Sequence, residues 1–582
     1  MAEPIFQCAG DQGIVVEYGQ EIDPLIHRQV MGLYHKLKHD NPPWLIEAIP
    51  TYRSLLVLFA PEQTQGEDLI AELKELGKLA KDYKGDEVGR QMEIPTVYGG
   101  EEGPDLDEVA SLTDLDPEEV TEIHAAGKYI VYMLGFTPGF PYLGGMDKRI
   151  AAPRLPSPRT EIPSGSVGIA GPQTGVYPQK SPGGWRIIGR TPLTLFDPKK
   201  DPPAYLQPGD QITFKPITRQ EADQMSKTQK SVISREKKDN GKEAAALIKQ
   251  PGMLTTVQDK GRWGYQHLGV PTAGAMDRLA LHIGNILTGN HQGAPALEMT
   301  MTGPKIYFYK DCVIAVTGAD LGPCVNGREI PMWTSLKVAA GSVVHFSGRK
   351  NGCRGYLSLA GGLKVPTVMG SSSTYLRGSF GGLQGRALKA GDEITLSRGR
   401  PCLIGAVAPK GLFEYLDEKS KLQVVLGPQE DYVSAESLKT FFSSTYTVSP
   451  QADRMGYRLD GPKLEHARPP DIISDGICPG AVQVPGHGAP IVMTADRQTT
   501  GGYPKIGAVT SLGLSSLAQR IPGDAVSFEE VSFAQALKAY KDKEDELAQW
   551  RRDLEEKLKN KGKTWRLTID GHTHQVMIGK SE

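Results

Sequence analysis

Apolar and polar residues in the first hundred positions alternate in a way that predicts strands separated by helices. The predicted strands are the apolar runs 14–19, 45–50, 54–60 and 92–100. Asp23-Pro24 is typical of a helix N-cap followed by proline in the first turn, and this helix is predicted to run to about His39. Apolar residues at helical spacing predict a second helix at about 66–83. The order β-α-β-β-α-β is the split-βαβ pattern and predicts an α+β domain over 1–98.

Residues 128–215 are rich in glycine and proline, yet they keep their aromatic residues. A short helix is predicted just before them, at Asp116-Pro117. Glycine permits tight turns and proline fixes φ, so the composition is typical of a rigid, loop-rich wall and not of a flexible linker. We therefore predict a β-barrel over 99–215, and a barrel without chemistry fits the same composition. The aromatic residues are Phe136, Phe140, Tyr142, Tyr177 and Trp185, and the polar side chains held by the wall are Gln173, Ser181, Arg186 and Arg190.

One short pattern, a glycine turn followed by an alternating strand, occurs four times. The copies are PGDQITF (208–214), AGSVVHF (340–346), AGDEITL (390–396) and PGDAVSF (522–528). Their separations of 132, 50 and 132 residues are too uneven for a solenoid. They fit strands that close barrels, although chance recurrence of a common turn stays open for any single copy. Together with the β-rich composition, they predict further barrels over 246–400 and 401–530.

Two segments differ from the barrels in composition. Residues 216–245 are polar, charged and free of aromatic residues, which predicts a linker. The last segment, 531–582, begins with a charged helical stretch and ends with an alternating hairpin whose predicted turn is Asp570-Gly571.

Composition narrows the function classes. With 582 residues the chain is too long for one core, and 67 glycines and 43 prolines favour turn-rich β architecture. A net charge of -2 gives no basic footprint for nucleic acid. We see no signal peptide and no apolar run of about 20 residues, so no membrane partner is expected. Six scattered cysteines without a CxxC pair predict no disulfide framework or zinc ribbon and favour the cytoplasm.

Several standard chemical signatures are missing. Gly562-Lys563-Thr564 lacks the opening glycine of a Walker A loop, because Lys557 stands there. There is no GxSxG, HExxH or GxGxxG motif and no Met-Lys-Met biotin site. His35 and His39 share a helix face, but without a third ligand nearby solvated histidines are favoured over a metal site. We therefore predict no bound metal and no covalently bound cofactor.

Polar residues gather in three glycine-rich loops, 173–190, 449–462 and 495–507. Such loops can offer a carboxylate, guanidinium, amide and ammonium to one small polar substrate. The candidate catalytic residues are Asp496, Lys505 and Tyr503. The candidate substrate-binding residues are Gln173, Ser181, Arg190, Arg454, Arg497, Gln498 and Thr499. The alternative is that an Asp-Arg pair pins a barrel loop. Asp277 is predicted to cap a helix, and Glu298 to be buried, paired and structural.

Long motifs in both halves resemble a known family. FTPGFPYLGG and SPGGWRIIGRTP resemble allophanate hydrolase subunit 1, whereas GPQEDYV, SPQADRMGYRLDGP and DRQTTGGYPKIG resemble subunit 2; these are also linked to the B and C subunits of 5-oxoprolinase. The resemblance covers about residues 10–530. It implies cyclophilin-like β-barrels in a mostly β, α+β chain, and two halves that face each other across one site. The same modules form the carboxyltransferase part of urea carboxylase.

This resemblance implies three alternative functions. The first is an enzyme component that acts on a small amide or lactam with an ATP-using partner; Arg454, Arg497 and Lys505 would hold a carboxyl group, and Gln173, Gln498 and Tyr503 would orient the amide. Asp496 would then accept the proton. The second is a carboxyltransferase that takes carboxybiotin from a separate biotin carboxylase. The third is a regulatory protein-binding module, because some relatives in this family inhibit a kinase. A homo-oligomer stays open.

Overall fold

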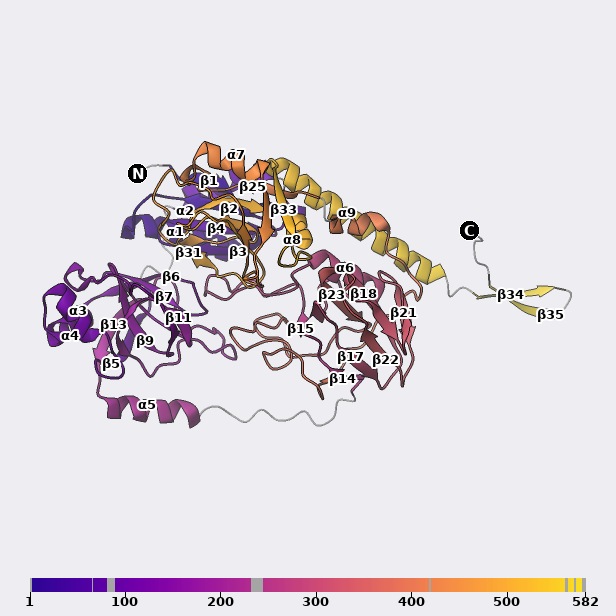
Figure 1. Ribbon diagram of the computed structural model, residues 1–582, viewed down its shortest axis with the longest axis horizontal. Coiled ribbons are helices and arrows are strands. Elements are labelled where there is room, and N and C mark those ends of the chain that lie inside the picture. The colour runs from indigo at the N-terminus through magenta and orange to yellow at the C-terminus, as the bar shows by residue number, and fades with distance from the viewer. Residues whose placement is uncertain are drawn as a thin grey trace.

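Four β-rich units form three lobes in the computed structural model, which describes residues 3–64, 66–80, 89–231, 244–417, 420–560, 564–569 and 572–577. The N-terminal sheet and the last barrel share the upper lobe of Figure 1, the first barrel forms the left lobe, and a two-sheet unit forms the right lobe. Units from opposite ends of the sequence are therefore packed together in one lobe.

The N-terminal unit is an antiparallel sheet of order β1-β2-β4-β3 with two helices. Asp23 accepts hydrogen bonds from the amides of Leu25 and Ile26, which confirms the predicted cap. The split-βαβ prediction is wrong in its last strand, because residues 91–98 pair in the first barrel and the unpredicted β1 extends the sheet instead. The elements are β1 (Ile5–Cys8), β2 (Gly13–Glu17), α1 (Pro24–Asp40), β3 (Leu45–Pro50), β4 (Ser54–Phe59) and α2 (Gly66–Ala80).

The first barrel closes in the order β10-β7-β6-β13-β5-β12-β9. Asp116 and Glu119 form a capping box at the start of a helix beside it, as Asp116-Pro117 predicted. A separate two-stranded antiparallel ladder of β8 and β11 lies outside the closed barrel. The elements are β5 (Gln91–Tyr98), α3 (Leu106–Thr113), α4 (Pro117–Ala126), β6 (Tyr129–Leu134), β7 (Pro141–Gly144), β8 (Arg159–Ile162), β9 (Ser166–Ala170), β10 (Gln173–Val176), β11 (Ser181–Gly183), β12 (Arg186–Arg190) and β13 (Gln211–Pro216).

The last barrel, of order β25-β32-β29-β30-β27-β26-β33, closes in the same way as the first. In each barrel the last strand lies parallel to the first, β13 beside β5 and β33 beside β25. Both closing strands follow a glycine with positive φ, Gly209 or Gly523, so the repeated turn has the role predicted for it. The elements are β25 (Leu422–Leu426), α7 (Ala435–Ser443), β26 (Thr445–Val448), β27 (Gly456–Asp460), β29 (Ala481–Gln483), β30 (Ile491–Met493), β32 (Lys505–Val509), α8 (Ser511–Leu517) and β33 (Ala525–Glu530), with β28 (Asp475–Gly476) and β31 (Thr500–Gly501) as a small separate ladder.

The segment predicted as a middle barrel, 246–400, instead forms two sheets. Their orders are β20-β19-β22-β17-β14-β24 and β15-β16-β23-β18-β21. The other two copies of the glycine-turn pattern supply β22 and β24 of the larger sheet, so a barrel-closing role is wrong for them. The elements are β14 (Ala246–Gln250), β15 (Leu254–Gln258), α6 (Arg278–Leu287), β16 (Ala296–Thr300), β17 (Lys305–Phe308), β18 (Cys312–Asp320), β19 (Pro323–Val325), β20 (Arg328–Glu329), β21 (Ser335–Val338), β22 (Val343–Phe346), β23 (Asn351–Leu359) and β24 (Glu393–Ile394).

Helices occupy both segments predicted to lie outside the barrels. The first part of the predicted linker is helix α5 (Arg219–Ser231), and residues 232–243 lie outside the described residues. Helix α9 (Phe533–Asn560) runs across two lobes: its Leu537 joins the N-terminal core, and its Trp550 packs in the cluster around α6 (Figure 1). The hairpin β34 (Thr564–Ile569) and β35 (His572–Met577) is confirmed, while its turn at 570–571 is not among the described residues.

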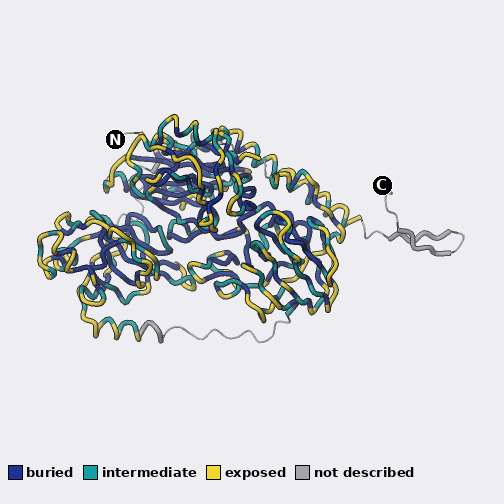
Figure 2. Tube along the Cα trace, viewed as in Figure 1, coloured by how far each residue is buried: buried dark blue, intermediate teal, exposed yellow. Residues whose placement is uncertain are grey.

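Buried chain runs through the centre of the molecule, where the lobes meet (Figure 2). Part of it is the loop 259–277, which contacts the first barrel where the carbonyl of Leu268 accepts from the amide of Gly139 at 2.8 Å. A separate apolar cluster joins the N-terminal sheet, through Leu56, to Ile477 of the last barrel. The interlocked units place loops of distant sequence around one shared interior.

The described part of the chain contains neither a helix that could cross a bilayer nor a disulfide bond. Within the described ranges, each helix is too short or too polar to cross a bilayer. All six cysteines are free thiols.

Candidate functional site

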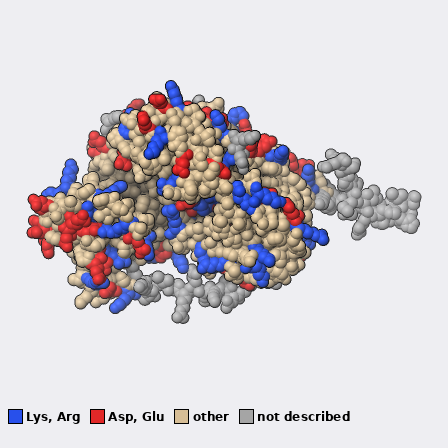
Figure 3. Space-filling view, viewed as in Figure 1, with Lys and Arg blue, Asp and Glu red and all other residues tan. Residues whose placement is uncertain are grey.

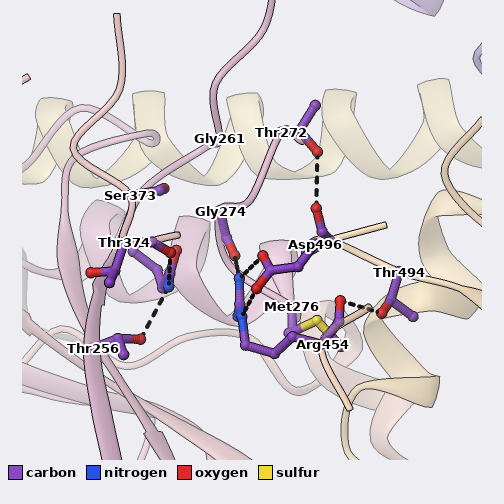
Figure 4. Close-up of polar contacts among 12 residues, drawn as sticks. Thr256, Gly261, Thr272, Gly274, Met276, Ser373, Thr374, Arg454, Thr494 and Asp496 are labelled. Atoms are coloured by element: carbon purple, nitrogen blue, oxygen red, sulfur yellow. Dashed lines mark hydrogen bonds and ion pairs between the residues drawn. The ribbon is translucent and has the colours of Figure 1, made fainter. Parts of the chain in front are cut away.

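Arg454 lies at the contact between the two-sheet unit and the last barrel. Its guanidinium binds both oxygens of Asp496, at 2.9 and 3.1 Å, and the carbonyl of Gly274 at 2.7 Å (Figure 4). It also binds one oxygen of Glu298 at 2.5 Å. Arg454, Asp496 and Glu298 are all buried. Four of the five N–H groups of the guanidinium are therefore engaged by the protein, and two buried carboxylates already balance its charge.

The same network continues into the two-sheet unit. The second oxygen of Glu298 accepts from the amide of Met276 at 2.9 Å and from the hydroxyl of Tyr356 at 2.7 Å. Burial alone would lower the pKa of Arg454, but the two carboxylates outweigh it and raise that pKa, whereas burial raises the pKa of Asp496. The predicted structural pairing of Glu298 is confirmed. These contacts favour the alternative in which the pair of Asp496 and Arg454 pins a barrel loop.

Asp277 borders this network and caps α6, as predicted. Its carboxylate accepts from the amide of Ala280 at 3.0 Å, from Gln519 at 2.7 Å and from the hydroxyl of Tyr415. Burial raises the pKa of Asp277 to about 6. The carboxyl group that caps the helix therefore changes its charge in the mildly acidic pH range.

Asp277 should make the protein less stable as the pH rises from 4 to 6. Its pKa of about 6 in the folded protein exceeds the value of about 3.9 expected in the unfolded chain. The stabilising contribution is therefore complete below about pH 4 and is lost as the pH rises through about 6. Urea denaturation at each pH should show a smaller decline in the unfolding free energy for Asp277→Asn than for the wild type. Asp460→Asn, at an exposed position, is the control, and identical slopes for all three proteins would contradict the assignment.

Arg497 is fully buried but meets only neutral acceptors. It donates to the carbonyl of Ile477 at 3.0 Å, to the hydroxyl of Thr272 at 3.3 Å and to the side-chain oxygen of Gln266 at 2.5 Å. Burial lowers its pKa to about 10. Glu47 of β3 holds the neighbouring loop by accepting from the amides of Gly264, Gln266 and His267. Thus the guanidinium is firmly positioned while no carboxylate of a described residue touches it.

Lys505 pairs with a residue that the sequence analysis missed. Its ammonium lies 3.1 Å from Asp475, which is fully buried and also accepts from Ser54 of the N-terminal sheet. Burial alone would raise the pKa of Asp475, but Lys505 and Arg53 outweigh it and hold the pKa below its usual value. An isolated acid inside the apolar stretch 472–478 is the sequence signal that could have identified it.

Gln173 lies where the first barrel meets the N-terminal unit. Its amide donates to the hydroxyl of Tyr52 at 2.5 Å, and the ring of Tyr52 lies 6.2 Å from that of Tyr142. The last barrel approaches the same surface, because a Cβ atom added to Gly135 would overlap the hydroxyl of Thr500. Three units therefore meet around these aromatic hydroxyls, and Figure 3 shows the molecular face hollowed where the lobes join.

Buried polar atoms without a partner among the described residues lie on both sides of this junction. Unpartnered buried groups are uncommon in proteins, and each calls for a partner such as a water, an ion or a ligand. On the last barrel, a Cβ added to Gly501 would lie 2.6 Å from the Gln498 amide and 3.3 Å from that of Gln483, so these amides and Thr500 form one group. The unpartnered atoms are the hydroxyls of Ser181 and Thr499 and the amide nitrogen of Gln483, while the Thr500 hydroxyl lies beside Tyr142.

Two predicted site residues lie elsewhere. Arg190 donates to the carbonyl of Ser164 at 2.8 Å and pairs with Glu102 at 3.3 Å, partly in solvent. Tyr503 is 40% exposed. The other eight candidates fall into four places: the Arg454–Asp496 network, the neutral cradle of Arg497, the Lys505–Asp475 pair and the junction around Gln173 and Thr500. Among the described residues, no group of three His, Cys, Asp or Glu side chains is placed to hold a metal ion.

Comparison with known proteins accounts for both halves. Residues 4–206 match the family described as carboxyltransferase domain, subdomain C and D, and residues 268–530 match carboxyltransferase domain, subdomain A and B. The chain belongs to the carboxyltransferase-domain family. The first barrel is therefore part of the C and D half, and the Arg454 network lies within the A and B half.

Relatives of this carboxyltransferase-domain chain correspond to one half each. The first part is 49% identical to the 5-oxoprolinase B subunit of Bacillus subtilis over 221 residues, 35% of this chain and 89% of the relative. The second is 38% identical to the 5-oxoprolinase C subunit of Escherichia coli over 299 residues, 51% of this chain and 94% of the relative. Urea amidolyase of Saccharomyces cerevisiae is 34% identical over 308 residues, 50% of this chain, but only 17% of that protein is covered.

A solved structure matches nearly the whole carboxyltransferase-domain chain. The crystal structure of TTHA0988 superposes with a TM-score of 0.78 at 33% identity and covers 89% of this chain and 99% of its own. The fused order of the two halves is therefore matched in a single solved chain.

Proposed function

We propose that this chain is the joined B and C component of an enzyme that opens a small lactam of the 5-oxoproline class with an ATP-using partner. The observation that carries this proposal is the junction where both halves meet. There Gln173, Tyr52 and Tyr142 face the loop of Thr499 and Thr500; the Thr500 hydroxyl lies beside that of Tyr142, and the Thr499 hydroxyl has no partner among the described residues. The identities to the B and C subunits of 5-oxoprolinase support the same class of substrate.

The junction offers groups that suit an amide. Burial raises the pKa of Tyr52 and Tyr142, so both hydroxyls stay protonated at neutral pH and can donate to a carbonyl oxygen. The carboxamide of Gln173 can pair with the N–H and C=O of a lactam. Such preorganised donors act most strongly on charge that develops during reaction. An unactivated amide still resists hydrolysis, and a partner that uses ATP would supply the activation.

In this proposal Lys505 supplies positive charge beneath the site. Asp475 pairs with Gly501 across the β28–β31 ladder, which brings its partner Lys505 under the loop of Thr500. Asp496 and Arg454 act as positioning residues, because the carboxylate and the guanidinium form an ion pair with each other. Tyr503, exposed at the surface, has no role in the chemistry.

Gln173→Ala should lower kcat/KM for 5-oxoproline by roughly 100-fold, the usual cost of losing one well-placed donor. The measurement is ATP hydrolysis that depends on 5-oxoproline, with the full chain and its ATP-using partner. Gln211→Ala removes an exposed glutamine of the same barrel, whose side chain pairs with Gln91, and should leave the rate unchanged. If no combination of chain and partner turns over 5-oxoproline or urea, the proposed function is wrong.

A second function follows from the family description. The match to carboxyltransferase domains and to urea amidolyase supports transfer of a carboxyl group from carboxybiotin supplied by a separate biotin carboxylase. Formation of allophanate from free carboxybiotin and urea would favour it. Decarboxylation that no small amide accelerates would count against it.

A further inference from the structure

A small pocket lies between the N-terminal unit, the two-sheet unit and the last barrel. It has a volume of about 30 Å³, enough for a few water-sized groups. None of its lining residues comes from the first barrel, so it is separate from the junction around Gln173. Its polar lining consists of Gln12, Arg278, Thr494, Arg497, Ser511 and Ser515.

The charges that line this pocket are all positive. Arg497 is 1% exposed and touches only neutral acceptors, as described above. Arg278 stacks on the ring of Trp263 at 4.9 Å, and no hydrogen bond or ion pair joins its guanidinium to a described residue. Arg278 is half-buried, and desolvation lowers its pKa as well. Two guanidinium groups thus face one cavity without a carboxylate of the described residues in contact.

Two acids act on these guanidinium groups, Glu47 on Arg497 and Asp11 on Arg278, and neither forms an ion pair with its guanidinium. Asp11 lies close enough to act on Arg278, but its two oxygens accept from the amide and the hydroxyl of Ser511, both at 2.9 Å. Burial raises the pKa of Asp11, so its charged form is itself disfavoured. A buried cation without a counter-charge is costly, and an anion in the pocket would offset that cost.

The donors also define the shape of the anion. A guanidinium presents parallel N–H groups that match the two oxygens of a carboxylate or phosphate. The volume admits only a small group. We propose that this pocket binds a small oxyanion of the carboxylate or phosphate class between Arg278 and Arg497.

The bound oxyanion would stabilise the packing of the units and would take no part in the proposed reaction. It would touch three units at once, and Arg497 belongs to the same loop as Thr499 and Thr500 of the junction. Because the anion would bind the folded chain and not the unfolded one, it should stabilise the whole assembly.

Thermal unfolding of the full chain tests this site without any activity measurement. Phosphate, acetate and bicarbonate are titrated separately at constant ionic strength with sodium chloride as the balance, which distinguishes the two classes of oxyanion. We expect a saturable rise in Tm with at least one of them and at least a tenfold weaker midpoint in Arg278→Gln. Arg278→Lys, which keeps the charge but loses the fork, should fall between.

Arg328→Gln, at an exposed position on β20, is the matched control and should behave as the wild type. Salting effects raise Tm without saturation and without regard to the variant. Equal responses of the wild type and Arg278→Gln, or no saturable response to any of the three anions, would overturn the proposal. Because no substrate or partner is present, this result does not depend on whether lactam turnover is found.

Discussion

Arg454→Met is expected to lower the unfolding free energy by about 3–5 kcal/mol, the typical loss when one partner of a buried ion pair is removed. The substitution leaves Glu298 and Asp496 buried without their shared cation. Chemical denaturation measures the loss. It should be smaller at pH 5 than at pH 8, because burial already raises the pKa of Asp496, which in the variant can take up a proton instead of remaining charged.

Arg377→Met is the matched control. Arg377 pairs with Asp453 at 3.0 Å, yet both side chains are more than half exposed, so water replaces the interaction. Its loss should be a small fraction of that of Arg454→Met. Equal losses would mean that the buried network does not hold the two units together.

Lys505→Met should abolish most activity and also weaken the fold. Asp475 would lose its nearest cation, and kcat for 5-oxoproline with the ATP-using partner should fall roughly 100-fold. The double variant Lys505→Met/Asp475→Asn removes both charges and should recover most of the lost Tm. Its kcat should stay low, because the ammonium near Thr500 is still missing.

The double variant separates two roles of Lys505. If the lysine only neutralises Asp475, activity returns together with stability. Such a recovery would remove Lys505 from the proposed chemistry and leave it as a positioning residue. A low kcat in a stable double variant would support direct electrostatic action on the substrate.

Local features of the fold could be predicted because they depend on neighbouring residues. Asp23 and Asp116 cap helices in the folded chain as their sequence context predicts, since a cap needs only the next few amides. Gly209 and Gly523 each start a closing strand because a positive φ is required there. The strands that pair with a given strand could not be predicted in this way. Residues 91–98 suit either sheet, and only the closure of the barrel decides between them.

The same limit applies to the two-sheet unit. AGSVVHF and AGDEITL resemble the closing strands closely, yet they lie in an open sheet. The pattern specifies a turn and a strand, while closure depends on how the other strands of that unit are arranged.

The candidate site shows this division at the level of single side chains. The loops of Gln173, Arg454 and Arg497 stand out in the sequence because glycine-rich loops with several polar residues are unusual. Their partners could not be read there. Asp475 and Glu47 lie hundreds of residues from some of the groups they bind, and no sequence spacing announces such pairs.

The sequence by itself therefore determined the helix caps, the turn-and-strand repeats, the absence of a Walker A loop and the family motifs of both halves. Only the tertiary structure decided which of the candidate side chains can still bind a substrate or another ligand. In the folded chain Arg454 binds two carboxylates, whereas Arg497 contacts only neutral acceptors among the described residues. The hydroxyl of Tyr52 lies within hydrogen-bond distance of Gln173. The physical reason is that the sequence specifies which side chain stands at each position. Which charged neighbours surround that side chain, and which of its hydrogen-bonding groups have no partner, depend on the distant segments that pack against it.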